Sequence, residues 1–485
     1  MPTPIAVCAA VWEIYLRTLE WLVVVALLPA IAGSLLAGQP GWMGWFAVLA
    51  AALVLLHAWL EGMHWQMGPA YLAAAVLLLE FTVHVNKPSI RISCAILAAL
   101  LLVASIALSW CLPMFQLPAP TGRYPVGTRT YSFLDPNREE THRGAAPGNR
   151  EVVAQFWYPA ATSRGRKARY RRPKETTRLS SYQAVLSTHS LQDAPLAAGR
   201  FPVVVLNPAW HGFRNRGTFI TQELASHGFV VAAISHTYNS SFVELSDGTV
   251  AHPDYGQDIG FNASEDFPIE GRIALANEEL AIHTADCRFV LDELERFDRT
   301  PGHAFQAHLL MQRVGSCGYS FGGAVAAELA REDPRVRAAL ELDGAMHGES
   351  AAHGLNKPLL LIESPTVAAP AKPAEDSETG PGATTTMWNR IAADKARSLE
   401  EYGGLRVVIA GIGHADFSDG IFMSPLRRFT RIGDIPAKRV ARILNAYIVA
   451  FFQQTLLDIP SPLLLAESQP FAEATLQVWR ARETA

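Results

Sequence analysis

Residues 314–330 read VGSCGYSFGGAVAAELA, and this stretch decides the fold. A short apolar run leads to Ser320, which stands between Gly318 and Gly322, and a run of small helix-forming residues follows. Glycine and serine are poor choices inside a strand or a helix, so the sequence predicts a sharp turn between the two elements. G-x-S-x-G at a strand-to-helix turn is typical of a nucleophile elbow, whose strained apex side chain stands exposed above a sheet.

Short apolar runs alternate with helical patterns on both sides of this turn. Residues 218–228 and 276–297 have the spacing of amphipathic helices. Strands are predicted at 151–159, 200–208, 229–236, 312–318, 337–344, 357–364 and 405–414. This alternation predicts an α/β fold with a mostly parallel sheet and helices on both faces. Functional residues are then expected at the carboxyl ends of the strands.

The first 115 residues have a different composition from the rest. They contain only three of the 41 Lys and Arg residues, Arg17, Lys87 and Arg91. Four apolar runs, at 19–36, 42–60, 67–85 and 92–115, are each near the length that spans a bilayer. A soluble bundle would need a polar face that these runs lack, and a cleaved signal peptide would need only one apolar stretch. The sequence therefore predicts a transmembrane region of four helices over residues 1–116.

The same composition predicts a multi-pass membrane protein with its catalytic domain at 117–485. Arg17, Arg123 and Arg129 would share one side of the membrane, and Lys87 and Arg91 the other. The compact loop that carries Lys87 and Arg91 lies where the positive-inside rule works best. We therefore expect the catalytic domain outside the cytoplasm.

Two segments of the polar part stand apart. Residues 164–174 carry seven basic side chains in eleven, which predicts either binding to anionic lipid headgroups or a solvated loop. Residues 366–386 are rich in Pro, Ala and Thr, and we expect a mobile surface insertion there. The five cysteines form no C-x-x-C motif, so neither a zinc site nor a disulfide framework is indicated.

A serine nucleophile needs a base, and the base needs an acid that fixes its tautomer. In α/β-hydrolases the order along the chain is Ser, acid, His. His414 follows the last predicted strand, where this order places the base. Asp343 and Glu363 each close one of the strands between, and their spacing leaves both open as the acid.

Two further acids and one histidine lie near these positions. Asp416 and Asp419 are too close in sequence to His414 to be favoured as its partner. The oxyanion of an ester-hydrolysis intermediate needs backbone amides, one of them from the residue after the nucleophile. Phe321 fills that place, and the HG turn in residues 207–217 indicates the amide of Phe213 for the second. His211 precedes the elbow and is expected to shape this loop.

Several blocks together resemble one known family. GYSFGG (318–323), ALELDGAM (339–346) and GIGHADFSD (411–419), with HGF and ELASHGFVVAAISH (211–236), look like the platelet-activating-factor acetylhydrolase family and its bacterial α/β-hydrolase relatives. The resemblance covers residues 124–457, outside the four apolar runs. It departs from the family at Tyr319, where a histidine is usual, and in the 366–386 insertion.

The resemblance implies an α/β-hydrolase fold and a role for each site residue. Ser320 is then the nucleophile, His414 the base, and Asp343 rather than Glu363 the acid. The amides of Phe213 and Phe321 form the oxyanion hole.

The resemblance also implies a serine carboxylic ester hydrolase that works through an acyl-enzyme, and the apolar runs place it in a membrane, for which we expect the bacterial inner membrane. Short-acyl phospholipids or other small esters are the expected substrates, with a role in lipid degradation. Membrane lipids are the other expected partners; no nucleic acid, metal or organic cofactor is implied, and no oligomeric state follows.

Two alternatives remain open on the sequence alone. An acyltransferase would use the same elbow with a hydroxyl or amine in place of water. A transport or sensing module with an inert hydrolase domain would use the apolar helices, and Glu80 is its best clue, because an intramembrane carboxylate is a functional candidate by default. The helices show no basic partner for Glu80 in sequence, and it lies near a helix end.

Overall fold

The computed structural model describes residues 16–36, 41–253, 268–368, 383–426, 432–467 and 469–482. They form two compact units. The helical unit comprises residues 1–116, 169–187 and 422–426, and the sheet unit comprises 117–168, 188–421 and 427–485. Most of the predicted insertion at 366–386 lies outside the described residues. Its two ends are helical, in α10 (Pro365–Ala368) and α11 (Ala383–Tyr402).

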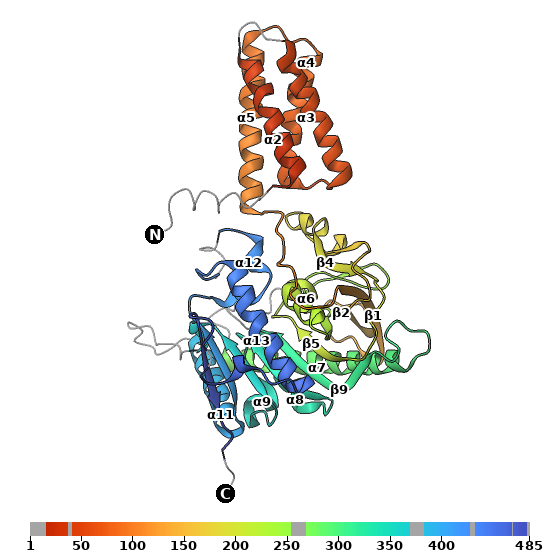
Figure 1. Cartoon of the computed structure of the whole chain (residues 1–485), viewed down its shortest axis with the longest axis vertical. Helices are drawn as coiled ribbons and strands as arrows, with labels where there is room; N and C mark the ends of the chain where they lie inside the picture. Colours follow the sequence, from red (N-terminus) through yellow and green to blue (C-terminus); the bar gives the residue numbers. More distant parts are fainter. Residues whose placement is uncertain are drawn as a thin grey trace, which may run out of the picture. The chain divides into compact units, whose positions relative to one another are not determined.

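The helical unit contains one helix for each predicted apolar run. The helices α2 (Thr18–Leu35), α3 (Gly41–Leu60), α4 (Gly68–Thr82) and α5 (Pro88–Cys111) lie side by side as a bundle (Figure 1). By length and composition α2 and α5 are suited to cross a membrane, whereas the apolar part of α3 is shorter and α4 has 15 residues. A third helix that meets this criterion, α13 (Ala437–Leu457), belongs to the sheet unit.

The bundle is packed with small residues inside and large apolar residues outside. Leu55, Trp59 and Leu100 are 72%, 80% and 64% exposed. The buried positions are largely alanines: Ala26, Ala30, Ala47, Ala50, Ala70, Ala73, Ala74 and Ala98. Small side chains let helix backbones approach closely, which is the packing style of helices in lipid.

Glu80 has the basic partner that we did not expect from the sequence. Its carboxylate is buried, accepts a hydrogen bond from Ser34 Oγ at 3.0 Å, and lies 3.7 Å from Arg91 Nε. The prediction that no basic partner accompanies it was therefore wrong. Arg91 lies eleven positions away in sequence, and the antiparallel packing of α4 against α5 brings it back to Glu80.

The sheet unit is built on eleven strands. Their order across the sheet is β13 (Ala474–Trp479), β12 (Gly404–Ile409), β11 (Leu359–Glu363), β10 (Val336–Leu342), β9 (Leu309–Tyr319), β5 (Phe201–Asn207), β6 (Val230–Ser235), β2 (Asn149–Pro159), β1 (Val126–Glu139), β4 (Ser187–Gln192) and β3 (Lys167–Arg169). The six strands from β12 to β6 pair in parallel, whereas β13, β2 and β1 each join an antiparallel pair.

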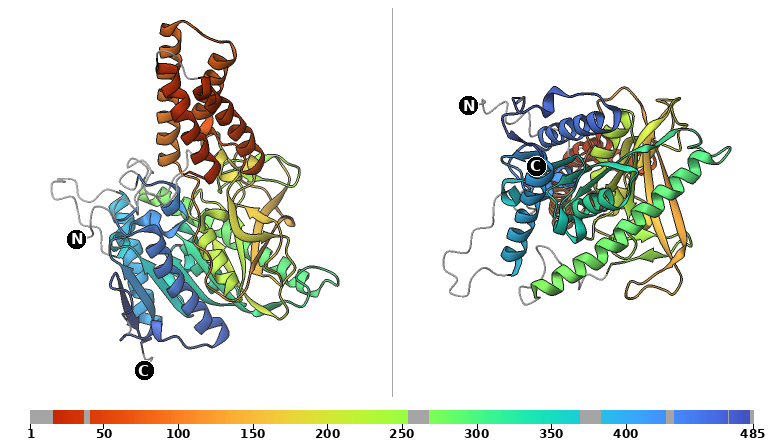
Figure 2. Two further views of the ribbon diagram at one scale, coloured as in Figure 1. Left: turned by 45° about the horizontal axis from the view of Figure 1, so that its top comes forward. Right: turned by 90° about the horizontal axis from the view of Figure 1, so that it is seen from below.

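Helices cover both faces of this sheet (Figure 2). On one face α6 (Thr218–Ser226) packs against α13, and on the other α7 (Ile269–Arg299), α8 (Phe321–Glu332), α9 (Gly348–His353) and α11 lie together. The core between β5, β9, α7 and α8 is made of fully buried apolar side chains. A hairpin of β7 (Val243–Glu244) and β8 (Val250–Ala251) and the short α12 (Gly420–Met423) complete the elements. The prediction of an α/β fold with a largely parallel sheet is confirmed.

Candidate active site

Ser320 stands at a strained corner between β9 and α8. Its φ is 58° and its ψ is −121°, in the region that non-glycine residues rarely adopt. A Cβ on Gly318 would meet the carbonyl oxygen of Gly322 at 1.7 Å, and one on Gly322 would meet that of Asn207 at 2.3 Å. The backbones therefore approach so closely that only glycine fits. The corner has the geometry of a nucleophile elbow.

The elbow serine is hydrogen-bonded to a histidine from a distant part of the chain. His414 Nε2 lies 3.0 Å from Ser320 Oγ, and His414 Nδ1 lies 2.7 Å from Asp343 Oδ2. The carboxylate of Asp343 is fully buried, and because it can only accept, Nδ1 carries the hydrogen and Nε2 presents its lone pair to the serine hydroxyl. This arrangement lets the imidazole take the proton of Ser320 while Asp343 stabilises the imidazolium.

The structure shows which of the two candidate acids contacts His414. Asp343 follows β10, and its carboxylate accepts hydrogen bonds from Ser364 N at 2.7 Å and from Ser364 Oγ at 3.1 Å. Glu363 ends β11, and its carboxylate is bonded to Lys395 Nζ at 2.7 Å and Arg406 Nε at 2.6 Å. Successive side chains of a strand point to opposite faces, so Ser364 reaches Asp343 while Glu363 turns away.

The two acids near His414 in sequence have other partners. Asp416 Oδ2 accepts the backbone amides of Gly413 at 2.8 Å and Gly433 at 2.6 Å, which shapes the loop around His414. Asp419 accepts the amides of Thr218 and Phe219 at the start of α6, where a carboxylate is favoured by the helix dipole. Both acids therefore stabilise the structure near the site.

Tyr319, which stands where a histidine is usual in the resembled family, contacts His414 directly. Its hydroxyl donates to the carbonyl oxygen of His414 at 2.9 Å, and the two rings lie 5.1 Å apart. The residue before the nucleophile thus holds the backbone that carries the imidazole.

The two residues predicted to supply oxyanion amides come from different parts of the sheet unit. Phe321 opens α8, where the first amides have no intrahelical acceptor. Phe213 follows β5 and precedes a short 3-10 helix (Arg214–Gly217). His211 has a φ of 55°, and its Nδ1 contacts the carbonyl oxygen of Asn239 at 3.0 Å. This histidine holds the loop, as the sequence predicts.

A buried polar network behind Phe321 was missed from the sequence. Asp286 on α7 accepts hydrogen bonds from two nitrogens of Arg150, at 2.7 and 2.6 Å, and from His236 Nδ1 at 3.0 Å. The ring of His236 stacks on that of His283 at 3.7 Å, and His283 lies 5.4 Å from the ring of Phe321. Burial, with the nearby His283, lowers the pKa of His236 to about 3. The neutral rings therefore pack as a wall behind the start of α8.

Two cavities border these residues. The smaller holds about 20 Å³ and is lined by Phe213, Tyr319 and Phe417 among others, which is room for little more than one water. The larger holds about 210 Å³ between α7, α9 and α11, and its wall begins three residues after Asp343.

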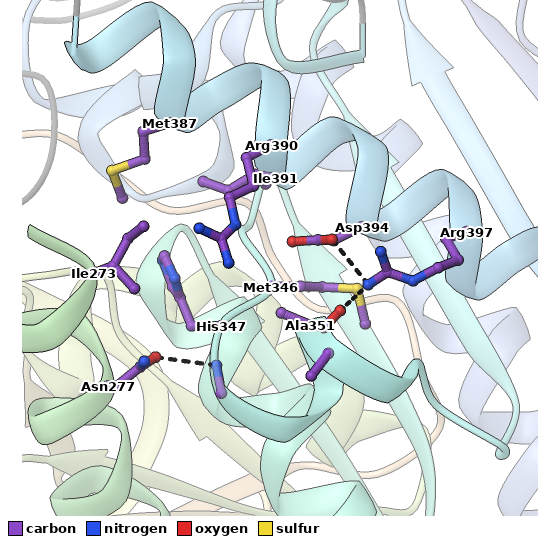
Figure 3. A pocket seen from close by; sticks show the side chains of 12 residues that line it. Ile273, Asn277, Met346, His347, Ala351, Met387, Arg390, Ile391, Asp394 and Arg397 are labelled. Carbon is purple, nitrogen blue, oxygen red and sulfur yellow. Dashed lines mark hydrogen bonds and ion pairs between the residues drawn. The ribbon is translucent and has the colours of Figure 1, made fainter. Parts of the chain in front are cut away.

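The larger cavity contains one inward guanidinium. In Figure 3 the side chain of Arg390 extends into the pocket beside His347, whereas Arg397 turns to Asp394, 2.8 Å away. Burial, with Arg390 and Lys395, lowers the pKa of His347 to about 4, so this imidazole is neutral. The ring of His347 lies 6.0 Å from that of Phe321. The pocket therefore offers an apolar wall and one cation close to the elbow helix.

A buried ion cluster lies beneath the turn at Asp343. Lys395 Nζ donates to Glu363 Oε1 at 2.7 Å and to the carbonyl oxygen of Gly344 at 2.6 Å, and it lies 3.4 Å from Glu341 Oε2. Burial raises the pKa of Glu341 to about 7, and Glu363 adds to this while Lys395 opposes it. Neither oxygen of Glu341 makes a hydrogen bond. Its ionised form is therefore poorly compensated.

We expect Glu341→Gln to stabilise the protein at high pH. The wild-type carboxyl ionises in the unfolded chain near its ordinary pKa, 4.5, but in the folded protein only near 7. Wild-type stability is therefore lost as the pH rises through this window. The free energy of unfolding of the variant should match that of the wild type within about 1 kcal/mol at pH 5 and exceed it by about 2–3 kcal/mol at pH 9. Denaturant unfolding followed by tryptophan fluorescence measures both values.

Glu363→Gln is the matched control with the opposite sign. Burial alone would raise the pKa of Glu363, but Lys395 and Arg406 hold it below its ordinary value. Loss of this carboxylate removes the closest anion of the buried Lys395 and the ion-pair partner of the partly buried Arg406, and should cost about 3–5 kcal/mol at pH 9. Equal effects of the two substitutions at pH 9 would contradict the assignment of Glu341 as the poorly compensated acid.

Known proteins resemble this chain in sequence and in fold. Platelet-activating factor acetylhydrolase from Canis lupus familiaris is 24% identical over 297 residues, which cover 57% of this chain and 62% of the relative. A probable 1-alkyl-2-acetylglycerophosphocholine esterase from Arthroderma benhamiae is 23% identical over 288 residues, which cover 56% and 65%. The chain thus matches less than two thirds of the length of these relatives.

A solved structure and a family model extend the likeness. The ferulic acid esterase from Streptomyces cinnamoneus has a TM-score of 0.59 and 30% identity, over 75% of this chain and 99% of its own. The model of the family described as platelet-activating factor acetylhydrolase, isoform II, matches residues 112–459. This match covers well over half of the chain and includes the elbow, Asp343 and His414, so the chain belongs to the platelet-activating factor acetylhydrolase, isoform II, family.

Proposed function

We propose that this protein is a serine carboxylic ester hydrolase that works through an acyl-enzyme. Ser320 is the nucleophile, His414 the general base and Asp343 the acid that orients it. The observation that carries the proposal is the hydrogen-bonded series at the elbow, with 3.0 Å from Ser320 Oγ to His414 Nε2 and 2.7 Å from His414 Nδ1 to Asp343 Oδ2.

The reaction follows from this geometry in two halves. His414 Nε2 takes the proton of Ser320 as Oγ attacks the ester carbonyl, and then returns it to the departing alcohol. Water next attacks the acyl-enzyme with His414 again as the base, which releases the acid and restores Ser320. The amides of Phe321 and Phe213 are assigned to the oxyanion in both halves.

We expect Ser320→Ala to abolish both ester hydrolysis and labelling by a fluorophosphonate probe, because no other group replaces Oγ. Asp343→Asn should lower kcat by about 10³–10⁴-fold, since an amide at this position favours the wrong tautomer of the histidine. Both effects are measured with p-nitrophenyl acetate on the full chain in detergent.

Ser316→Ala is the matched control for the nucleophile. Ser316 lies on β9, four residues before Ser320, is fully buried, and its Oγ has no hydrogen-bond partner among the described residues. This variant should keep its labelling. Labelling of Ser320→Ala at the wild-type level would refute the proposed nucleophile.

We assign short-acyl esters of an anionic alcohol, of which short-acyl phospholipids are the example, as the substrate class. Two observations support this class. The cavity beside Phe213 and Tyr319 is small, at about 20 Å³, and Arg390 supplies a cation in the larger pocket. The relatives are named as an acetylhydrolase and as an esterase of an acetylated glycerophosphocholine, which is a phosphate-bearing short-acyl ester.

Acyl-chain length tests the substrate class. In a series of p-nitrophenyl esters, kcat/KM should fall by at least about tenfold from acetate to octanoate, because each added methylene must enter a site without room for it. Arg390→Met should raise KM for a phosphate-bearing ester and leave the rate with p-nitrophenyl acetate unchanged. A preference for long acyl chains, or equal effects of Arg390→Met on both esters, would refute this substrate class.

We further propose that residues 1–116 are a membrane region of four helices and that residues 117–485 are the catalytic domain, held outside the cytoplasm. The outward Leu and Trp side chains of α3 and the inward alanines of the bundle support the first part. Exposure of these apolar side chains to water raises the free energy of the bundle, and their placement in lipid lowers it. The Lys87 and Arg91 loop supports the orientation.

Membrane fractionation tests this arrangement. The full chain should stay in the membrane pellet after washing with alkaline carbonate and with high salt, and should enter solution only with detergent. Added protease should degrade the catalytic domain in spheroplasts with a sealed inner membrane. Release by carbonate would refute the membrane region, and protection of the domain from protease would refute the orientation.

A further inference from the structure

We propose that the helical unit binds a first-row transition-metal dication, with Zn²⁺ as the type ion, through Glu20, His57 and His64. One ligand atom of each residue lies within 4.8 Å of the other two, and all three side chains are buried. Two imidazoles and a carboxylate form a ligand set that zinc uses in proteins. The family match begins only at residue 112, so these residues lie outside it.

The three ligands come from separate elements that meet at one end of the bundle. Glu20 lies in the first turn of α2, His57 in the last turn of α3, and His64 in the connection that leads to α4. The first turn of α2 and the last turn of α3 are adjacent because the two helices run in opposite directions. An ion here would tie three segments of the chain together.

Hydrogen bonds fix the tautomers of both histidines with Nε2 unprotonated. Arg17 Nη2 can only donate, and it lies 2.9 Å from His57 Nε2, so the hydrogen of a neutral His57 is on Nδ1, which lies 3.1 Å from the hydroxyl of Tyr71. Gln66 Nε2 donates to the carbonyl oxygen of Leu112, which turns Gln66 Oε1 toward His64 Nδ1 at 2.9 Å. Such partners on the outer nitrogen are typical of metal-binding histidines.

One contact in the cluster needs a positive charge between its atoms. With its hydrogen on Nδ1, His64 presents a lone pair from Nε2 to Glu20 Oε1 at 2.9 Å, and two acceptors repel at that distance. Either a second proton on His64 or a metal ion resolves the contact. The other oxygen of Glu20 is held by the backbone amide of Arg17 at 2.9 Å, so Oε1 stays aimed at the histidines.

The distances from Glu20 Oε1 to the two imidazole nitrogens are close to those of tetrahedral coordination, and the third spacing lies within 4.8 Å. Metal–ligand bonds of about 2.0–2.1 Å place neighbouring ligand atoms about 3.3 Å apart. His57 Nε2 lies 3.3 Å and His64 Nε2 lies 2.9 Å from Glu20 Oε1. The contact between His64 and Glu20 would lengthen by about 0.4 Å to reach this spacing.

Glu61 is the fourth ligand in this proposal. Its Oε2 is buried and has no hydrogen-bond partner among the described residues. This oxygen lies 3.5 Å from Arg17 Nε and 3.7 Å from His57 Nε2. Its Oε1 is held by the amide of Leu19 at 3.3 Å, which anchors the carboxylate beside the site. Arg17 contacts Glu20 and His57 as well, so the guanidinium and the ion compete for these atoms, and Arg17 keeps the carbonyl oxygens of Glu61 and Gly62.

The test measures the metal directly on the full chain in detergent micelles. After purification from zinc-supplemented cells without chelator, the wild type should contain about one zinc ion per chain by mass spectrometry of the metal. X-ray absorption at the zinc edge should show nitrogen and oxygen neighbours at about 2.0–2.1 Å, with the outer scattering of imidazole rings. This measurement needs no variant, so a misfolded mutant cannot obscure it.

Variants then locate the ion. His57→Gln and His64→Gln should each lower the zinc content to near zero, and Tyr71→Phe, which removes the partner of His57 Nδ1, should weaken binding by about 10–100-fold. His84→Gln is the matched control, because His84 is exposed and follows the opposite end of α4. Ser320→Ala should keep its zinc, so the result is independent of the proposed hydrolysis. Zinc-free wild type, absence of imidazole scattering, or full zinc content in His64→Gln would overturn the proposal.

Discussion

The close approach of three backbone segments at Ser320 is the constraint on which the rest of the site depends. β9 arrives, α8 departs, and the end of β5 passes beside them with no space for a Cβ at Gly318 or Gly322. This contact forces the serine into a φ of 58°, a conformation that costs of order 1–3 kcal/mol and persists only where surrounding structure over-determines it. The same contact sets Ser320 Oγ above the sheet and the amide of Phe321 beside it.

Residues around the elbow form hydrogen bonds to Asp343, to His414 and to the turn after Asp343. Ser364 fixes the carboxylate of Asp343, Tyr319 fixes the backbone of His414, and Lys395 fixes the carbonyl after Asp343. Each acts from a different strand or helix, so the positions of Asp343 and His414 follow from the parallel sheet and not from local sequence. A hydrogen-bonded geometry supported in this way is preorganised, which is what the proposed reaction requires.

Much of this arrangement could be predicted from the sequence because its signals are local. Five consecutive residues, 318–322, predict the elbow, and short apolar runs predict the parallel strands. Local signals do not distinguish Asp343 from Glu363 as the acid, because each residue lies at the end of a predicted strand. Only the resemblance to a family favours Asp343. The structure supplies the physical reason: Lys395 and Arg406, more than thirty positions away, neutralise Glu363.

The features that the sequence did not predict depend on contacts between segments that are far apart in the chain. The stacked His236 and His283 come from β6 and α7 and meet only in the folded core. The last strand, β13, has alternating burial and joins the sheet antiparallel, and its apolar residues are too few to stand out. Arg91 reaches Glu80 only through helix packing.

Burial of polar and charged side chains at one end of the bundle costs free energy of folding. Glu20, His57 and His64 are buried in a unit whose other interior residues are mostly alanine and leucine, and buried charged or polar groups are costly unless they are paired. Arg17 offsets one carboxylate, but Glu20 and Glu61 together carry two negative charges, and Arg17 is the one Lys or Arg side chain among the described residues that pairs with them. A proton on His64 would balance the charge, and it would leave Glu61 Oε2 without a hydrogen-bond partner in the described part of the chain. A dication bound to Glu20, Glu61 and both imidazoles satisfies that oxygen and the lone pair of His64 together, which is why we favour the ion over the proton.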